Sequence, residues 1–219
     1  SVLGVAIIPP YETYITYEVY IAPGLIAMIQ LFNGMQSSLS MVYDREMGSM
    51  KTMLVSPIPR WFLLISKLSA GVFVSVLQVY AFLLIASFWD IKLPISGYFT
   101  ILPALIISGL MLGALGMFLS SAIKQLENFA GVMNFVIFPM FFASSALYPL
   151  WKIEETSIWL YYVCLYNPFT YSVEIIRFLM YSNFNVEYTL GVIIFSIVFL
   201  FLAIIGYDPA RGTLQKKGG

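Results

Sequence analysis

The chain has 219 residues, of which 60% are hydrophobic and 10% charged, with a formal net charge of zero. A water-soluble domain could not cover so much apolar surface, so the composition predicts an integral membrane protein, and the zero charge gives no general attraction to nucleic acid. Histidine is absent and Cys164 is the single cysteine, which excludes an internal disulfide and a metal site of the His/Cys type. We interpret Cys164 as a small apolar residue.

Long apolar stretches predict an all-α, polytopic bundle of transmembrane helices, because about 20 apolar residues suffice to span a bilayer. Tyrosine-rich residues 11–20 are expected at the outer interface, and Pro139 is expected to kink the fourth crossing. A mixed segment at 149–181 is too polar for a plain crossing and predicts one or two short helices in or on the outer leaflet. We expect five crossings, at residues 21–42, 61–88, 98–123, 128–148 and 188–207.

The distribution of lysine and arginine predicts the orientation of the chain. If segment 43–67 is cytoplasmic, the inner side holds Arg45, Lys51, Arg60, Lys67, Lys124, Arg211, Lys216 and Lys217. The outer side then holds only Lys92, Lys152 and Arg177. We therefore expect a multi-pass protein of the plasma membrane, in a bacterium the inner membrane, with a cytoplasmic C-terminus.

The segment 43–60 combines charges, helix-favouring residues and a break. Residues 44–55 have a helical composition, the sequence Ser56-Pro57-Ile58-Pro59 ends that helix, and Trp61 begins the next crossing. A short helix and a sharp turn would form a rigid projection that a soluble partner can push. The alternative is a solvated loop whose basic residues only reflect the excess of lysine and arginine on the cytoplasmic side of membrane proteins. We assign to coupling Arg45, Glu46, Met47, Met50, Lys51, Met53, Leu54, Ser56, Pro57 and Arg60.

Three amide side chains lie in the first expected crossing. Gln30, Asn33 and Gln36 are spaced i, i+3 and i+6, within an arc of about 120° on one helix face. A polar side chain that faces lipid leaves hydrogen bonds unmade, so these residues should face protein or a cavity. They either line a translocation path or form hydrogen bonds between helices.

Two further features have alternative interpretations. Glu174 and Arg177 are spaced to pair on one helix face, and with Asn167 and Pro168 they form a candidate outer gate. The alternative is that the two charges only neutralise each other near the lipid. The Gly109-x-x-x-Gly113 pattern permits close helix approach, either within one subunit or between two.

Two motifs resemble one transporter family. Residues 45–61, REMGSMKTMLVSPIPRW, resemble the cytoplasmic coupling segment of the ABC-2 family, the membrane permeases of ATP-driven exporters. Residues 166–171, YNPFTY, resemble the Asn-Pro element that precedes the last crossing in that family. Both motifs occur in the family order. The resemblance implies a single permease domain over 1–219 that lacks the first of the usual six crossings.

The resemblance also implies a function and partners. Two permease copies, identical or closely homologous, would bind two ABC ATPase subunits at the cytoplasmic face. No Gly-x-x-x-x-Gly-Lys-(Ser/Thr) loop occurs, so the chain is expected to be a transport subunit and not an enzyme, without a cofactor of its own. ATP and Mg are expected in the partner ATPase. The alternatives are an ATP-independent secondary transporter or channel subunit, or a non-transport membrane scaffold.

Overall fold

The computed structural model describes residues 16–47, 60–89, 94–123 and 126–206. Within them the chain forms eight α-helices, one short 3-10 helix and no strand, which confirms the all-α bundle. The helices are α1 (Tyr17–Glu46), α3 (Arg60–Ala86), α4 (Ile95–Ala122), α5 (Leu126–Phe142), α6 (Leu150–Thr156), α7 (Ile158–Leu165), α8 (Pro168–Met180) and α9 (Val186–Gly206), and the 3-10 helix is Ser87–Trp89.

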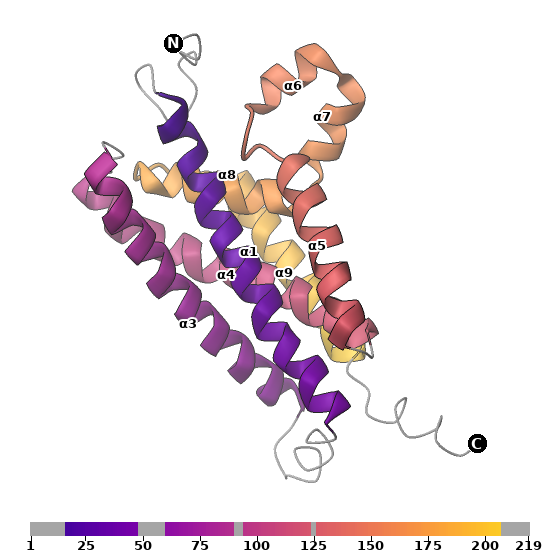
Figure 1. The fold of residues 1–219 in the computed structure, drawn as a ribbon. Coiled ribbons are helices and arrows are strands. Elements are labelled where there is room, and N and C mark those ends of the chain that lie inside the picture. The colour runs from indigo at the N-terminus through magenta and orange to yellow at the C-terminus, as the bar shows by residue number, and fades with distance from the viewer. Residues whose placement is uncertain (1–15, 48–59, 90–93, 124–125, 207–219) are drawn as a thin grey trace.

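Four of these helices, α1, α3, α4 and α9, are long and apolar enough to cross a membrane. They coincide with the crossings expected at 21–42, 61–88, 98–123 and 188–207. Helix α4 is the centre of the bundle. In its apolar 18-residue membrane-crossing stretch, 67% of the residues are buried, whereas the same share in α9 is 11%. Helices α1, α3, α8 and α9 all pack on α4 (Figure 1).

The remaining expected crossing, 128–148, is shorter than predicted. Helix α5 has 17 residues and a length of about 25 Å, less than the roughly 30 Å of a hydrocarbon core. It ends at Phe142, three residues beyond Pro139, and is followed by a turn. In this turn Ser144 donates to the carbonyl of Phe141 at 2.6 Å, so a side chain partners one of the carbonyls at the helix end.

Helix α1 is longer than the crossing predicted at 21–42. It begins at Tyr17, within the segment expected to be interfacial, and it continues to Glu46 without a break at residue 43. The expected start of a separate helix at residue 44 is therefore wrong, because no glycine or proline lies between Val42 and Glu46 to end α1. The expected helix up to residue 55 and the proline turn lie in 48–59, outside the described residues.

The segment 149–181 forms three helices, α6, α7 and α8, where one or two were predicted. The third helix exists because Asn167 accepts a hydrogen bond from the amide of Phe169 and Pro168 occupies the first helical position. Helix α8 is buried over most of its length, whereas α6 and α7 pack on each other and expose aromatic side chains. The sequence alone did not show that α8 is a core element.

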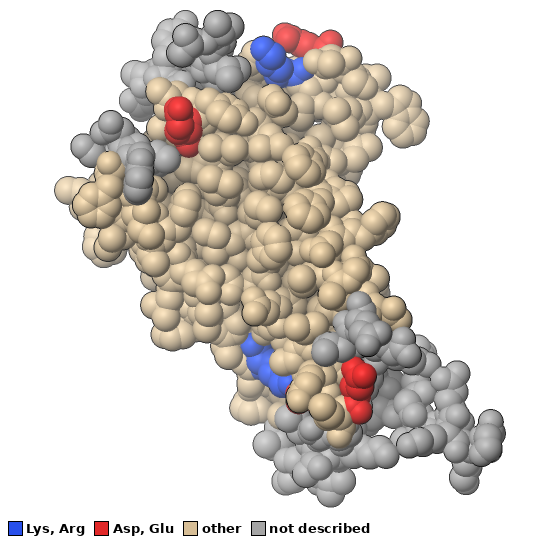
Figure 2. Space-filling model, in the orientation of Figure 1, with Lys and Arg blue, Asp and Glu red and all other residues tan. Residues whose placement is uncertain are grey.

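The bundle has two polar ends and an apolar middle. The α8 end contains the first residues of α1, α4 and α9, and the opposite end contains the last residues of α1 and α4 (Figure 1). Figure 2 shows charged side chains at both ends and an uncharged belt between them. This pattern is that of a protein embedded in a bilayer.

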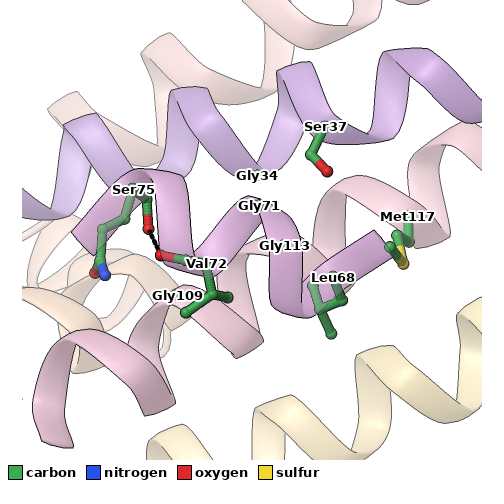
Figure 3. A pocket seen from close by; sticks show the side chains of 10 residues that line it. Gly34, Ser37, Leu68, Gly71, Val72, Ser75, Gly109, Gly113 and Met117 are labelled. Atoms are coloured by element: carbon green, nitrogen blue, oxygen red, sulfur yellow. Dashed lines mark hydrogen bonds between the residues drawn. The ribbon is translucent and has the colours of Figure 1, made fainter. Parts of the chain in front are cut away.

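Close packing of α1, α3 and α4 depends on glycines that we call the glycine seam: Gly34, Gly71, Gly109, Gly113 and Gly116. A Cβ atom added at Gly34 would lie 2.9 Å from the Cα atom of Gly113. The three helices leave a cavity of only about 10 Å³ between them (Figure 3). The Gly109-x-x-x-Gly113 pattern therefore packs helices within one chain.

Candidate functional site

At the end opposite α8, the structure joins the two helices that flank segment 48–59. Lys67 of α3 forms an ion pair with Asp44 of α1. Glu46 and Met47 are exposed at the end of α1, and Arg60 begins α3. A force on the intervening segment would thus reach α1 and α3 together. The side chains of Arg45 and Arg60, and all of Met50, Lys51, Met53, Leu54, Ser56 and Pro57, lie outside the described part of the chain.

The three amides of α1 have different environments. Gln30 is buried against α4, where its Nε2 donates to the carbonyl of Leu105 at 2.6 Å and its Oε1 accepts from Ser108 at 2.6 Å. This geometry fits the alternative of a hydrogen bond between helices. Asn33 fits the same alternative, because it donates to Gln78 Oε1 of α3 at 2.7 Å, whereas Gln36 is exposed.

Asn33 and Gln36 line a groove between α1 and α3. The groove has a volume of about 400 Å³ and apolar walls, with three amides on its surface and no charged residue in its lining. This composition suits an uncharged molecule that has apolar and polar parts. Sequence reasoning missed Gln78, although an isolated amide in the apolar α3 is the same signal that identified the α1 residues. The lining residues are Leu25, Met28, Ile29, Phe32, Asn33, Gln36, Gln78 and Phe82.

Asn167 and Pro168 join α8 to the end of α5. The amide nitrogen of Asn167 donates to the carbonyls of Met140, at 2.8 Å, and Ala143, at 2.6 Å. The Met140 carbonyl belongs to the last turn of α5 and the Ala143 carbonyl follows it directly, where a helix leaves carbonyls without an intrahelical partner. Thr170 adds a bond to the carbonyl of Cys164 at 2.6 Å. The Asn-Pro element therefore fixes where α5 ends and where α8 begins.

Glu174 and Arg177 form the ion pair that their spacing predicted, and both are buried in protein. Arg177 Nη2 also donates to the carbonyl of Ser145 at 2.9 Å, and its guanidinium lies 4.2 Å from the ring centroid of Tyr20. Sequence reasoning missed Tyr20 and Ser145, because they lie 157 and 32 positions from Arg177 and such contacts leave no local pattern.

Burial also acts on two titratable groups of segment 149–181. Burial raises the pKa of the nearby Tyr181 hydroxyl, although the Arg177 charge acts in the other direction. Burial likewise raises the pKa of the Cys164 thiol. Among the residues that the structure describes, no group of three or more Asp, Glu, Cys or His side chains could hold a metal ion.

Comparison with known proteins agrees with this architecture. The sequence model of the family described as ABC-2 type transporter matches residues 5–181. The protein named as transport permease ycf38 of Porphyra purpurea is 29% identical over 92% of this chain and 72% of its own length. The YbhR permease of Escherichia coli strain K12, named for a multidrug ABC transporter, is 30% identical over 76% of this chain but only 45% of its own length. The ycf38 protein of Cyanophora paradoxa is 32% identical over 76% of this chain and 57% of its own length.

Proposed function

The chain belongs to the ABC-2 type transporter family, and from this premise we propose that it is the permease subunit of an ATP-driven exporter, coupled to a separate ATPase. One observation supports the coupling most directly. The helices on either side of segment 48–59 pack on each other and are also joined by the Asp44–Lys67 ion pair, so the segment connects to two helices that are in contact. Helix α1 carries any movement from there over about 45 Å to the α8 end.

The proposed ATPase contact is an apolar surface at the end of α1. Met47 is 63% exposed, and Met50, Met53 and Leu54 follow at helical spacing. Methionine suits such a contact because its side chain adapts to a groove. Burial of four such side chains would contribute roughly 1.5–3 kcal/mol each before the cost of association.

The proposed path for the cargo is the α1–α3 groove at Asn33, Gln36 and Gln78. Its neutral lining and three amides favour an uncharged amphipathic cargo. The word multidrug in the name of the Escherichia coli relative is in line with such a cargo. A second permease copy is proposed to complete the path, and Glu174 and Arg177 are proposed to belong to its outer gate.

We propose that the chain lies in the plasma membrane. In the proposed orientation, segment 43–67 and the C-terminal tail are both cytoplasmic. The excess of basic residues on that side supports it. Reporter fusions at the C-terminus test the orientation, and an external reporter signal would contradict it.

Coupling is tested with a pair of double variants in the complex with the ATPase. Met50→Asp with Leu54→Asp places two charges on the proposed apolar face, and we expect the ATPase to dissociate during purification. Ser49→Asp with Thr52→Asp adds the same charge at polar positions of the same segment, and we expect the complex to persist. If both variants keep the ATPase, the docking surface lies elsewhere. Transport that continues without ATP would instead support a secondary transporter or channel.

A further inference from the structure

Tyr20 lies where three separate parts of the chain meet. It is fully buried in the first turn of α1, and its hydroxyl donates to the carbonyl of Ser145 at 2.9 Å. Ser145 belongs to the turn between α5 and α6. The same carbonyl accepts a second bond, from Arg177 of α8. A single backbone oxygen thus connects α1, α8 and the turn after α5.

The ring of Tyr20 makes a second, independent contact with Arg177. The guanidinium lies 4.2 Å from the ring centroid, a distance at which a cation is attracted to the face of an aromatic ring. On its other side Arg177 pairs with Glu174. The ring, the carboxylate and the carbonyl together fix the position of this buried charge.

The approach of α1 to the turn requires a small residue one helical turn after Tyr20. A Cβ atom at Gly24 would lie 2.7 Å from the Cβ atom of Ala146. Helix α1 therefore contacts the turn at Tyr20 and, one helical turn later, at Gly24. A tilt of α1 about the Gly24 contact would displace Tyr20 from the Ser145 carbonyl. Arg177 would then lose its aromatic contact while Glu174 remained beside it.

We propose that Tyr20 is a positioning residue of the outer gate: its ring and hydroxyl hold Arg177, and with it α8, against α1 and the turn at Ser145 while the gate is closed. The proposal rests on the proposed transport function. Helix α1 carries Tyr20 in its first turn and ends beside the coupling segment, so movement of α1 would release α8 at the far end of the same helix.

A buried serine of α8 provides the readout. Ser172 is fully buried, and its hydroxyl has no hydrogen-bond partner among the described residues. In a Cys164→Ser background, Ser172→Cys is a small change that reports opening of α8 through its rate of reaction with a membrane-impermeant maleimide. The full chain is labelled in membranes of cells that also produce its ATPase, so no cargo needs to be known.

We expect Tyr20→Leu to raise the labelling rate at position 172 by tenfold or more without ATP, and Tyr20→Phe, which keeps the ring, to raise it less. The matched control is Tyr80→Leu. Tyr80 of α3 also donates to a backbone carbonyl at the α8 end, that of Tyr98 at 2.6 Å. Its variant should label like the parent.

Two results would overturn the proposal: unchanged labelling in both Tyr20 variants, or equal increases in the Tyr20 and Tyr80 variants. If Tyr20→Leu does not accumulate in the membrane, Tyr20→Phe alone decides, because it removes only the hydroxyl. Trapping the ATPase with ATP and vanadate should raise labelling of the parent toward the Tyr20→Leu rate. If trapping does not change labelling of the parent while Tyr20→Leu still raises it strongly, ATP coupling is refuted and the positioning role of Tyr20 stands.

Discussion

Substitution of Gly34 by alanine should separate α1 from α4. The new Cβ atom would lie 2.9 Å from both the Cα and the N atom of Gly113, and 3.1 Å from the carbonyl carbon of Leu112. All three are backbone atoms of α4, so no side chain can rotate away to make room. The helices must move apart by several tenths of an ångström. Such a shift strains the two bonds of Gln30, which lies one turn earlier on α1.

The magnitude follows from two contributions. Overpacking at a closely packed contact costs about 1–3 kcal/mol. Hydrogen bonds between membrane helices contribute about 0.6 kcal/mol each, and two are strained here. Alanine regains up to about 1 kcal/mol of helix propensity relative to glycine. Gly131→Ala receives the same gain without a penalty, because nothing lies within 4 Å of its added Cβ atom. The free energies of unfolding of the two variants should therefore differ by about 2–4 kcal/mol.

Equilibrium unfolding of both variants in mixed detergent micelles measures this difference directly. We expect Gly34→Ala to unfold at a lower denaturant concentration than the parent, and Gly131→Ala at the same or a higher one. The propensity gain is common to both variants, so it cancels from the comparison. Equal stability of the two variants would refute a close contact between α1 and α4 at Gly34.

Three further predictions concern other parts of the chain. Cys164 should react slowly with maleimide at pH 7, because burial raises the pKa of its thiol and so lowers the fraction of reactive thiolate. Its reaction should become fast only at a higher pH than an exposed cysteine requires, and rapid labelling at pH 7 would contradict this. Asn167→Ala should lower the free energy of unfolding by about 1–3 kcal/mol, since it removes the partner of the Met140 and Ala143 carbonyls and of the Phe169 amide. An unchanged unfolding curve would show that water replaces these bonds. Lys67→Met should lower that free energy by less than about 1 kcal/mol, because the ion pair with Asp44 is partly exposed, and a larger loss would indicate a buried role.

Some features were predictable because they depend on residues that are close in sequence. The apolar stretches predicted the all-α class and five crossings, of which four are full-length helices, since the bilayer thickness alone sets the required length. The spacing of Glu174 and Arg177 predicted their ion pair, because one helix turn brings these positions together. Residues 166–171 and 45–61 indicated the family.

Other features depended on contacts between distant segments. No local pattern distinguishes Gln30, which bonds to α4, from Gln36, which faces the groove, because neighbouring helices decide which part of one helix face is covered. The end of α5 is fixed by an amide from residue 167. Residues 44–46, predicted to be helical, extend α1, and Asp44 pairs there with Lys67 of α3.

Composition and periodicity by themselves determined that this chain enters a membrane, where its four longest helices lie and which residues are too polar to face lipid. Only the tertiary structure decided that α8 is a buried core helix and that Tyr20 and Ser145 complete the environment of Arg177. The physical reason is that transfer of a segment into lipid depends on its own residues, whereas the partner of a buried polar group depends on which helices pack together.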